Sequence, residues 1–391
     1  MMVADSEFLP AHGGGEREHV GFVRAATDAG WLSAVVIPVR EPLNLDAYRA
    51  VLGDVPVIST HRRTGPLMLM HPRYPYVVAS RPFPAWLPDR IQAVAPDSDG
   101  VVTFSYKSWR IGERLAITLG LPMVIRQHNL EGAYHRSLAD GLHGPRRLVM
   151  RWEARRIERD ERKLDCSGSV SAIADISADD AAARLAAGAH RVLHVPPFAF
   201  DTRLVTAEPG KRDERPDGRR VLFVGALDVV TNVSALRWLL EHVWRDVRAR
   251  LPDLLLDIVG RKPSPVVRAL VAASPGTELY ADVPDVLPFL HRATIAVNPA
   301  IIGSGVNIKL VDYLLAGLPV VTTGLATRGL ALRADVDLVV ADSPAAFADG
   351  LVALLGDPAR AERLAASGQA RIQEMLDPRR NLERLADGFA G

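Results

Sequence analysis

Short apolar runs alternate with helix-patterned segments along most of the chain. The clearest runs lie at 221–225, 254–260, 278–281, 294–298, 319–323 and 338–341. Each run has the length of a strand, and the segments between them have the 3.6-residue spacing of amphipathic helices. This alternation predicts an α/β fold class with a doubly wound parallel sheet, in which ligands bind at the carboxyl ends of the strands.

The first half of the chain carries a weaker version of the same pattern. Strands are predicted at 2–8, 33–39, 101–104, 122–126 and 169–173. Residues 41–95, rich in Pro, Arg and aromatic residues, are predicted to be irregular. The polar run 206–218 is predicted to be a linker. The chain therefore divides into an N-terminal domain, 1–205, and a C-terminal domain, 219–375, with a final helical segment, 376–391.

One segment, 303–323, combines a glycine loop, a helix and a strand. Gly303 and Gly305 give the loop its conformational freedom, and Asn307 is placed to cap the helix that follows. Gly317 and Pro319 then end the helix. Ser304 and Val306 complete the loop.

Lys309 and Asp312 are polar positions of this helix that the apolar stripe leaves out. They lie three residues apart and are therefore neighbours on the helix surface. A helix N-terminus after a glycine loop suits a phosphate, Lys309 adds a positive charge, and Asp312 is able to accept bonds from the two hydroxyls of a ribose. The alternative is an ordinary Lys–Asp pair on the surface.

This segment resembles the donor-binding segment of the retaining glycosyltransferases of family 4 (glycosyl transferases group 1). That family usually has two glutamates eight positions apart, where this chain has Ser304 and Asp312. The resemblance implies the GT-B fold, in which two doubly wound Rossmann-like domains face a central cleft. It also implies that 1–205 binds the acceptor, that 219–375 binds the nucleotide sugar, and that 376–391 crosses back to the first domain.

The resemblance extends to other predicted donor-binding residues. Gly225 and Asp228 follow a predicted strand, Asn232 is expected to cap the next helix, and Arg261 follows the strand after it. The Arg and Lys that many family members have in the first of these loops are absent. Neutralisation of the donor phosphates is therefore expected to depend more heavily on Lys309.

The resemblance also implies that two loops of the N-terminal domain meet the acceptor, the transferred sugar and the diphosphate. The first contains Gly13, Gly14 and Gly15, although a tight turn alone would also explain glycines there. The second follows a predicted strand and contains the sequence 126–131, Arg-Gln-His-Asn-Leu-Glu. Arg126 and Asn129 are assigned to acceptor or phosphate binding. His128, with Lys309 and Asp312, is assigned to catalysis, since the family places a similar histidine near the transferred sugar.

Composition removes several other functions. The net charge of +1 provides no bulk electrostatic case for nucleic acid binding, and the single cysteine, Cys166, excludes an internal disulfide. No metal-ligand cluster or cofactor motif is recognised, so a metal-independent transferase without a cofactor is expected. No apolar run approaches membrane-spanning length and no signal peptide is recognised, which favours a cytoplasmic location.

Residues 145–164 form a strongly basic helical segment. Acidic residues interleave with the arginines, which favours a solvated helix with surface ion pairs. The alternative is a surface for anionic lipid or for a lipid-diphosphate acceptor, which would place the protein peripherally on the inner face of the membrane.

The sequence thus predicts a retaining, hexosyltransferase-like enzyme that moves a sugar from a nucleotide diphosphate sugar to a glycan, lipid-linked or small-molecule acceptor. Two alternatives remain open. A sugar-nucleotide epimerase would share the fold, but the sequence places no acid/base carboxylates for it. A non-catalytic sugar-nucleotide-binding partner is suggested by Ser304 and by the missing Arg and Lys.

Overall fold

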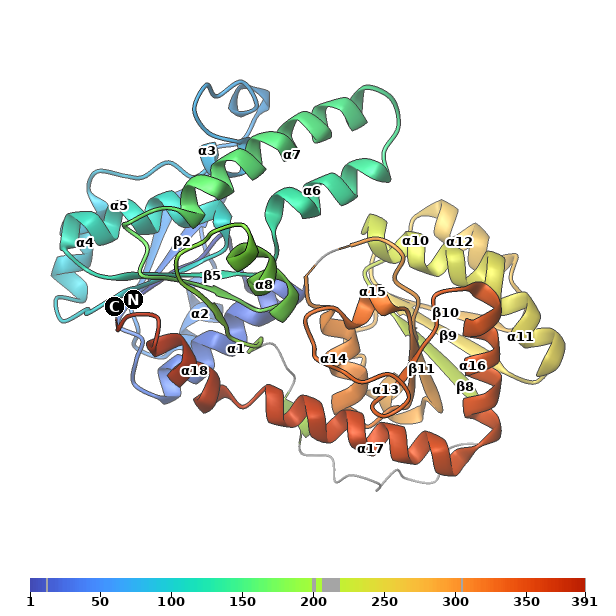
Figure 1. The fold of residues 1–391 in the computed structure, drawn as a ribbon. Helices are drawn as coiled ribbons and strands as arrows, with labels where there is room; N and C mark the ends of the chain where they lie inside the picture. Colours follow the sequence, from blue (N-terminus) through green and yellow to red (C-terminus); the bar gives the residue numbers. More distant parts are fainter. Residues whose placement is uncertain (12, 199–201, 206–218, 304, 391) are drawn as a thin grey trace. The chain divides into compact units, whose positions relative to one another are not determined.

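The computed structural model describes residues 1–11, 13–198, 202–205, 219–303 and 305–390. The chain splits into two compact units (Figure 1). The N-terminal unit comprises Met1–Ala199 and Leu376–Gly391, and the C-terminal unit comprises Phe200–Met375. The predicted linker 206–218 and the site residue Ser304 lie outside the described residues.

The N-terminal unit contains a parallel sheet of order β3-β2-β1-β4-β5-β6-β7. Its strands are β1 Met2–Val3, β2 Val35–Val39, β3 Val57–His61, β4 Val101–Phe104, β5 Met123–Gln127, β6 Ala172–Asp175 and β7 Val192–His194. The strand order reverses between β1 and β4, which pair with each other in register Met2 to Val102. Such a reversal is where an open parallel sheet forms its ligand crevice.

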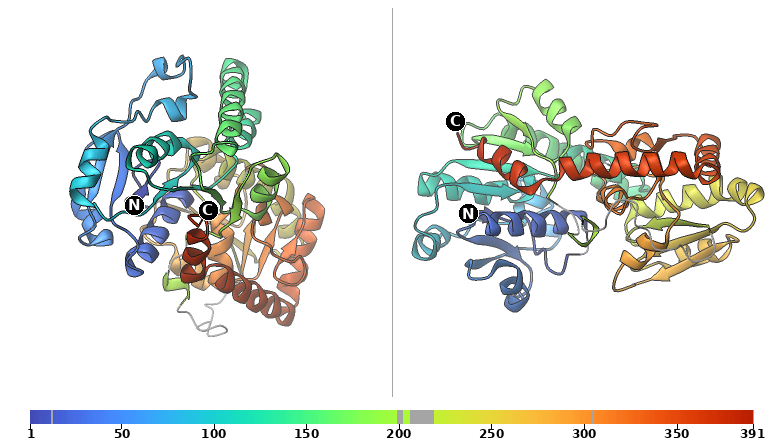
Figure 2. Two further views of the ribbon diagram at one scale, coloured as in Figure 1. Left: turned by 60° about the vertical axis from the view of Figure 1, so that its left-hand side comes forward. Right: turned by 90° about the horizontal axis from the view of Figure 1, so that it is seen from below.

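Helices cover both faces of this sheet (Figure 2). They are α1 Gly14–Asp28, α2 Leu45–Leu52, α3 Tyr76–Ala79, α4 Leu87–Val94, α5 Trp109–Leu119, α6 Glu131–Asp140, α7 Gly144–Asp165, α8 Ala178–Ala186 and α18 Pro378–Ala386, with short 3-10 turns η1 Pro66–Met68 and η2 Tyr106–Ser108. One core packs α1, α2 and α18 against the sheet, and it includes Phe22, Tyr48 and Leu382. The other packs α4 and α5 and includes Ile91 and Leu115.

The C-terminal unit has a second parallel sheet, of order β10-β9-β8-β11-β12-β13. Its strands are β8 Arg220–Val224, β9 Leu255–Gly260, β10 Thr277–Ala281, β11 Ile295–Asn298, β12 Val320–Thr322 and β13 Val339–Val340. Its helices are α9 Thr202–Val205, α10 Val230–Trp238, the π-helix η3 Leu239–Trp244, α11 Arg245–Arg250, α12 Pro265–Ala272, α13 Leu287–Arg292, α14 Ile308–Leu315, α15 Gly324–Thr327, α16 Pro344–Gly356 and α17 Pro358–Met375. The order reverses between β8 and β11.

The predicted α/β fold class is confirmed, but the prediction that 41–95 is irregular is wrong. This segment contains α2, β3, α3 and α4. Asn44 caps α2 by accepting a bond from the Ala47 N–H. β3 is an edge strand whose alternate residues are exposed, so its apolar run is short. Edge strands and short helices depend on tertiary packing more than on local pattern. The first strand is also shorter than predicted.

Arg126 on β5 is part of this packing, which corrects its assignment to acceptor or phosphate binding. Its side chain is fully buried. The guanidinium donates to Glu18 at 2.6 and 2.8 Å and to the carbonyls of Val195 and Pro196, both at 2.7 Å. Glu18 in turn accepts a bond from the Phe198 N–H at 2.6 Å. These donors are used within the unit, where they join β5 to α1 and to the segment after β7.

We therefore expect Glu18→Gln to destabilise the protein. The substitution leaves the buried Arg126 charge uncompensated, which typically costs about 3–5 kcal/mol. Urea denaturation of the full chain measures the loss, with Glu41→Gln as the control because Glu41 is exposed. A Glu18→Gln midpoint equal to that of the control would contradict the structural role of this pair.

Candidate functional site

The glycine loop and His128 lie side by side at the carboxyl edge of the N-terminal sheet. Gly13 precedes α1, and its N–H donates to the Glu16 carboxylate at 2.7 Å. Gly14 is the first residue of the helix. A Cβ on Gly15 would lie 3.7 Å from His128 Nδ1, an ordinary contact distance, so this glycine lies directly beside the histidine ring. Asn129 follows in the loop between β5 and α6.

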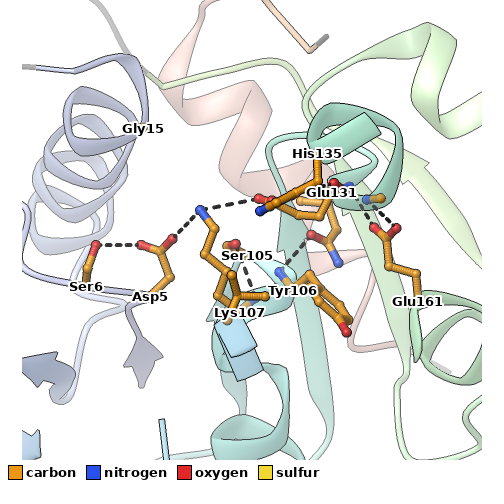
Figure 3. A network of polar contacts seen from close by, with 12 residues as sticks. Asp5, Ser6, Gly15, Ser105, Tyr106, Lys107, Glu131, His135 and Glu161 are labelled. Atoms are coloured by element: carbon orange, nitrogen blue, oxygen red, sulfur yellow. Dashed lines mark hydrogen bonds and ion pairs between the residues drawn. The ribbon is translucent and has the colours of Figure 1, made fainter. Parts of the chain in front are cut away.

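A polar network continues from this loop across the ends of β1, β4 and β5 (Figure 3). His19 Nδ1 bonds to the Gly15 carbonyl at 2.6 Å, and its Nε2 lies 3.3 Å from Asp5. The Lys107 ammonium lies between Asp5, at 3.2 Å, and Glu131, at 3.3 Å. Each of the three residues Asp5, Lys107 and Glu131 follows the end of a different strand.

The charges of this network are interdependent. Burial acts to raise the pKa of Asp5, but Lys107 and the neighbouring bases outweigh it and hold that pKa well below its usual range. Burial acts to lower the pKa of Lys107, but the carboxylates of Glu131 and Asp5 outweigh it, so the pKa of Lys107 is raised above its usual value. Burial also lowers the pKa of His128, helped by the adjacent His19. The network is therefore ionised at Asp5 and Lys107 and neutral at His128.

Backbone geometry sets the position of Lys107. Ser105, directly after β4, has φ of 66°, an uncommon value for a residue with a side chain. The turn is held by bonds from the Tyr106 N–H to Gln127 at 2.9 Å and from the Lys107 N–H to Ser105 Oγ at 3.3 Å. Residues in such conformations concentrate at functional sites.

The sequence analysis did not assign roles to Asp5, His19, Lys107 or Glu131. A usable signal was present, because Asp5, Lys107 and Glu131 each come shortly after an apolar strand. Since the carboxyl ends of parallel strands share one edge, such residues are expected to gather there. The obstacle was the first strand, which was predicted to run through Asp5.

In the C-terminal unit, the reversal between β8 and β11 brings two predicted donor loops together. Gly303 and Gly305, after β11, have φ of 137° and 74°, so both use conformations that favour glycine. Gly225 follows β8, and a Cβ there would lie 3.0 Å from the Asn232 side chain. Asn232 does not cap α10 as predicted, because it lies inside the first turn; its amide donates to the Ala226 carbonyl at 3.0 Å.

The side chain of Lys309 reaches from the start of α14, which follows one of these loops, to Asn232, which follows the other. Its ammonium donates to the Asn232 side-chain oxygen and lies 5.3 Å from the centre of the Phe223 ring. Burial lowers the pKa of Lys309 from 10.5 to about 8. Among the described residues no carboxylate forms an ion pair with Lys309, so a ligand anion placed here would meet a partly buried cation without a carboxylate partner.

Helix α14, whose second residue is Lys309, is anchored to the end of β8. The Val224 N–H, at the end of β8, donates to the Tyr313 hydroxyl at 2.7 Å. Tyr313 lies one turn after Lys309, and Asp312 is half-buried beside it. Asn307 occupies the N-cap position as predicted, but its side chain makes no capping bond, and Val306 precedes it. The helix is followed by Gly317 with φ of 62°.

The other predicted donor residues are less closely grouped. Asp228 is exposed and lines a groove of about 450 Å³ along α10, together with Arg237, Trp238, His242, Ser264 and Ile301. Neither Asn232 nor Lys309 is among the residues that line this groove. Arg261 follows β9, and its carbonyl accepts a bond from the Leu227 N–H. Both assignments stay predictions.

The described residues include neither a metal-ligand cluster nor a membrane-spanning helix. That part of the chain holds no group of three or more His, Cys, Asp or Glu side chains able to bind a metal ion. Its helices also include none with the length and apolar character to span a bilayer.

Part of the chain matches a known protein family. Residues 218–357 match the family described as Glycosyl transferases group 1, a region that contains Lys309, Asn232 and Asp312. A Klebsiella pneumoniae protein described as "Uncharacterized 44.6 kDa protein in cps region" is 26% identical over 173 residues. That similarity covers 41% of this chain and 43% of the Klebsiella protein, so it spans less than half of the relative's length.

Solved structures match over nearly the whole chain. HepE of Anabaena in complex with UDP-glucose has a TM-score of 0.66 and 14% identity, covering 100% of this chain and 98% of that one. Sucrose-phosphate synthase of Thermosynechococcus elongatus has a TM-score of 0.68 and 15% identity, covering 99% and 97%. Pneumococcal O-GlcNAc transferase GtfA in complex with UDP and GlcNAc has a TM-score of 0.66 and 11% identity, covering 100% of this chain and 98% of that one. The fold is therefore the GT-B fold of glycosyltransferases.

The lowered pKa of Lys309 generates a prediction for both stability and activity. We expect Lys309→Met to reduce kcat by about 10²–10³, the usual effect of losing one preorganised charge. Because it removes a partly buried charge that has no carboxylate partner among the described residues, it should leave the melting temperature unchanged or raise it. In the wild type, kcat/KM should fall as the pH rises through about 8, since Lys309 loses its proton there.

Lys262→Met is the matched control, because Lys262 is an exposed lysine in a neighbouring loop. Steady-state kinetics against pH and thermal unfolding measure both effects. A stable Lys309→Met protein with kcat within threefold of the control would remove Lys309 from the reaction.

Proposed function

We propose that this protein is a glycosyltransferase that moves a sugar from a nucleotide diphosphate sugar to an acceptor, with retention of configuration and without a required metal ion. The observation that carries the proposal is the Lys309 ammonium, partly buried at the start of α14 between two loops and bound there by a neutral amide. The matched family region contains all these elements.

The chemistry follows from where charge develops. As the bond between the sugar and the diphosphate breaks, negative charge accumulates on the leaving phosphate. The N-terminus of α14 offers free N–H groups and the positive end of a helix dipole, and Lys309 adds a full charge. Groups fixed there before the reaction stabilise the transition state more than the ground state, which is the condition for a rate increase. Asp312 would hold the ribose hydroxyls.

The N-terminal unit supplies groups suited to sugar hydroxyls. Asp5 and Glu131 are acceptors, Lys107 is a donor, and neutral His128 can donate through one ring nitrogen and accept through the other. Such a mixed set is suited to a hydroxyl-rich ligand. We propose that this network, which lies beside Gly15 and His128, orients the sugar or the acceptor.

The neighbours crystallised with UDP, UDP-glucose or GlcNAc support a nucleotide-sugar donor and make UDP-sugars the first probes to use. Retention and metal independence rest on the resemblance of 303–323 to the family 4 segment. For metal independence, the fixed positive charges at Lys309 and the α14 N-terminus add a physical reason, because they replace the role of a divalent cation at the diphosphate.

A sugar-nucleotide epimerase is the second candidate, because the network places carboxylates, Asp5 and Glu131, at the strand ends. An epimerase needs a carboxyl group that can give up a proton. The depressed pKa of Asp5 works against that role, since the group stays ionised. Product analysis without acceptor separates the two functions: an epimerised nucleotide sugar supports the second, and slow release of free sugar supports the first.

Asp312→Ala tests the donor site directly. If Asp312 holds the ribose, its loss should weaken UDP and UDP-sugar binding equally, by roughly 10- to 150-fold, the value of about 1.5–3 kcal/mol for a bond to a charged group. Isothermal titration calorimetry measures both affinities, with Asp349→Ala as a surface control, since Asp349 is exposed. Unchanged affinity for both ligands would exclude Asp312 from nucleotide binding.

Chelation tests the metal. We expect transfer to continue in EDTA at the rate seen with Mg²⁺, because positive charges of the protein take the metal's place. Product formation is followed with and without EDTA, Mg²⁺ and Mn²⁺. Activity lost in EDTA and restored by either ion would overturn metal independence while leaving the donor assignment intact.

A further inference from the structure

Helix α7 has its acidic and basic residues on different sides, which its sequence does not reveal. The acids Glu153, Asp160 and Glu161 are all buried. Asp160 accepts a bond from the Tyr106 hydroxyl at 2.7 Å, and Glu161 accepts from the Glu131 and Gly132 N–H groups at 2.8 and 2.9 Å. Some of the predicted ion pairs form, such as Arg136 with Glu158 and Lys163 with Asp160, but Asp160 and Glu161 are also used inside the unit.

The opposite side of α7, all of whose residues the structure describes, is basic and apolar. Arg155, Arg159 and Arg162 are exposed and take part in no ion pair with the described residues. Leu148 is 70% exposed and Trp152 is 46% exposed, and they lie on the same side one turn apart. No acidic residue of α7 falls in the exposed class.

A second segment extends this surface. In the loop after β3, Leu67 is 79% exposed and Met70 is 76% exposed. Arg156 joins this loop to α7, because its guanidinium donates to the Leu69 carbonyl at 2.8 Å and also stacks on the Trp152 ring at 4.6 Å. Between residues 55 and 88 the chain contains no Asp or Glu. Figure 1 shows α7 paired with α6 and extending beyond the sheet.

We propose that this surface, formed by the exposed side of α7 and by Leu67 and Met70, docks the protein on a membrane rich in anionic lipid. Arginines attract the negative surface of the bilayer. Apolar side chains and a tryptophan beside them enter the boundary between headgroups and acyl chains. Exposed apolar side chains that lie together, rather than singly, indicate an interaction surface.

The apolar residues decide between a bilayer and a soluble polyanion. A nucleic acid or an acidic polysaccharide would use the arginines but would gain little from burying Leu148, Trp152, Leu67 and Met70. A bilayer uses both sets. The occupant that fits the whole surface is therefore an anionic lipid bilayer, and the proposal does not rest on the proposed transferase activity.

The test is co-sedimentation of the full chain with vesicles of phosphatidylcholine alone or mixed with phosphatidylglycerol. We expect binding to the mixed vesicles only, weakened by salt. Arg155→Gln with Arg159→Gln should weaken it on the order of 30-fold, from the contribution of each basic residue near an anionic surface. Leu148→Ser with Trp152→Ser should weaken it at least about tenfold.

The controls carry equivalent changes elsewhere on the N-terminal unit. Trp31→Ser is matched to Trp152, because both tryptophans are 46% exposed. Arg24→Gln with Arg90→Gln is matched to the arginine pair, since both are exposed. Control variants should bind the mixed vesicles as the wild type does, and all variants should keep wild-type affinity for UDP-sugar.

Three results would overturn the proposal. The first is no binding to either vesicle, and the second is equal loss of binding in the controls. The third is a Leu148→Ser, Trp152→Ser variant that binds mixed vesicles and heparin as tightly as the wild type, which would mean a purely ionic surface for a polyanion.

Discussion

The parallel direction of the strands is the constraint on which both candidate sites depend. Every pair of strands in the described residues is parallel, so each following loop leaves its sheet at the same edge. At the two reversal points, between β1 and β4 and between β8 and β11, the loops diverge and leave a crevice. Lys107 lies near the first point and Lys309 near the second. Each unit thus places a partly desolvated cation where its sheet opens.

The partners of a buried cation distinguish its role. Arg126 is saturated by a carboxylate and two carbonyls, so its charge is balanced and its donors are used within the unit. Lys309 has a neutral amide and an aromatic face, and burial lowers its pKa. A charge in that state makes the empty site less stable and favours an incoming anion. Lys107, held between Asp5 and Glu131, is intermediate, because its charge is balanced while its side chain is not fully covered.

In helix α7, too, some charged side chains find partners inside the unit and others remain exposed. Packing against η2, α6 and α8 takes up its acids, because Tyr106, the α6 N-terminus and Arg184 need negative partners. Arg155, Arg159 and Arg162 remain exposed, on the side of the helix that carries Leu148 and Trp152. A basic segment in which acidic residues interleave with arginines along the sequence therefore presents a basic and apolar side in the fold.

The sequence by itself determined the alternation of strands and helices in the C-terminal unit, the glycine loop, and the helix that carries Lys309 and Asp312. These features are local: the apolar period, the positive φ of Gly303 and Gly305, and the end of α14 at Gly317 depend on neighbouring residues. Only the tertiary structure decided that Arg126 is internal, that Asn232 binds Lys309 rather than capping α10, and that Asp5, Lys107 and Glu131 meet. Those outcomes depend on which strands lie side by side, and residues such as Glu18 and Arg126, 108 positions apart, carry no local signal of their pairing.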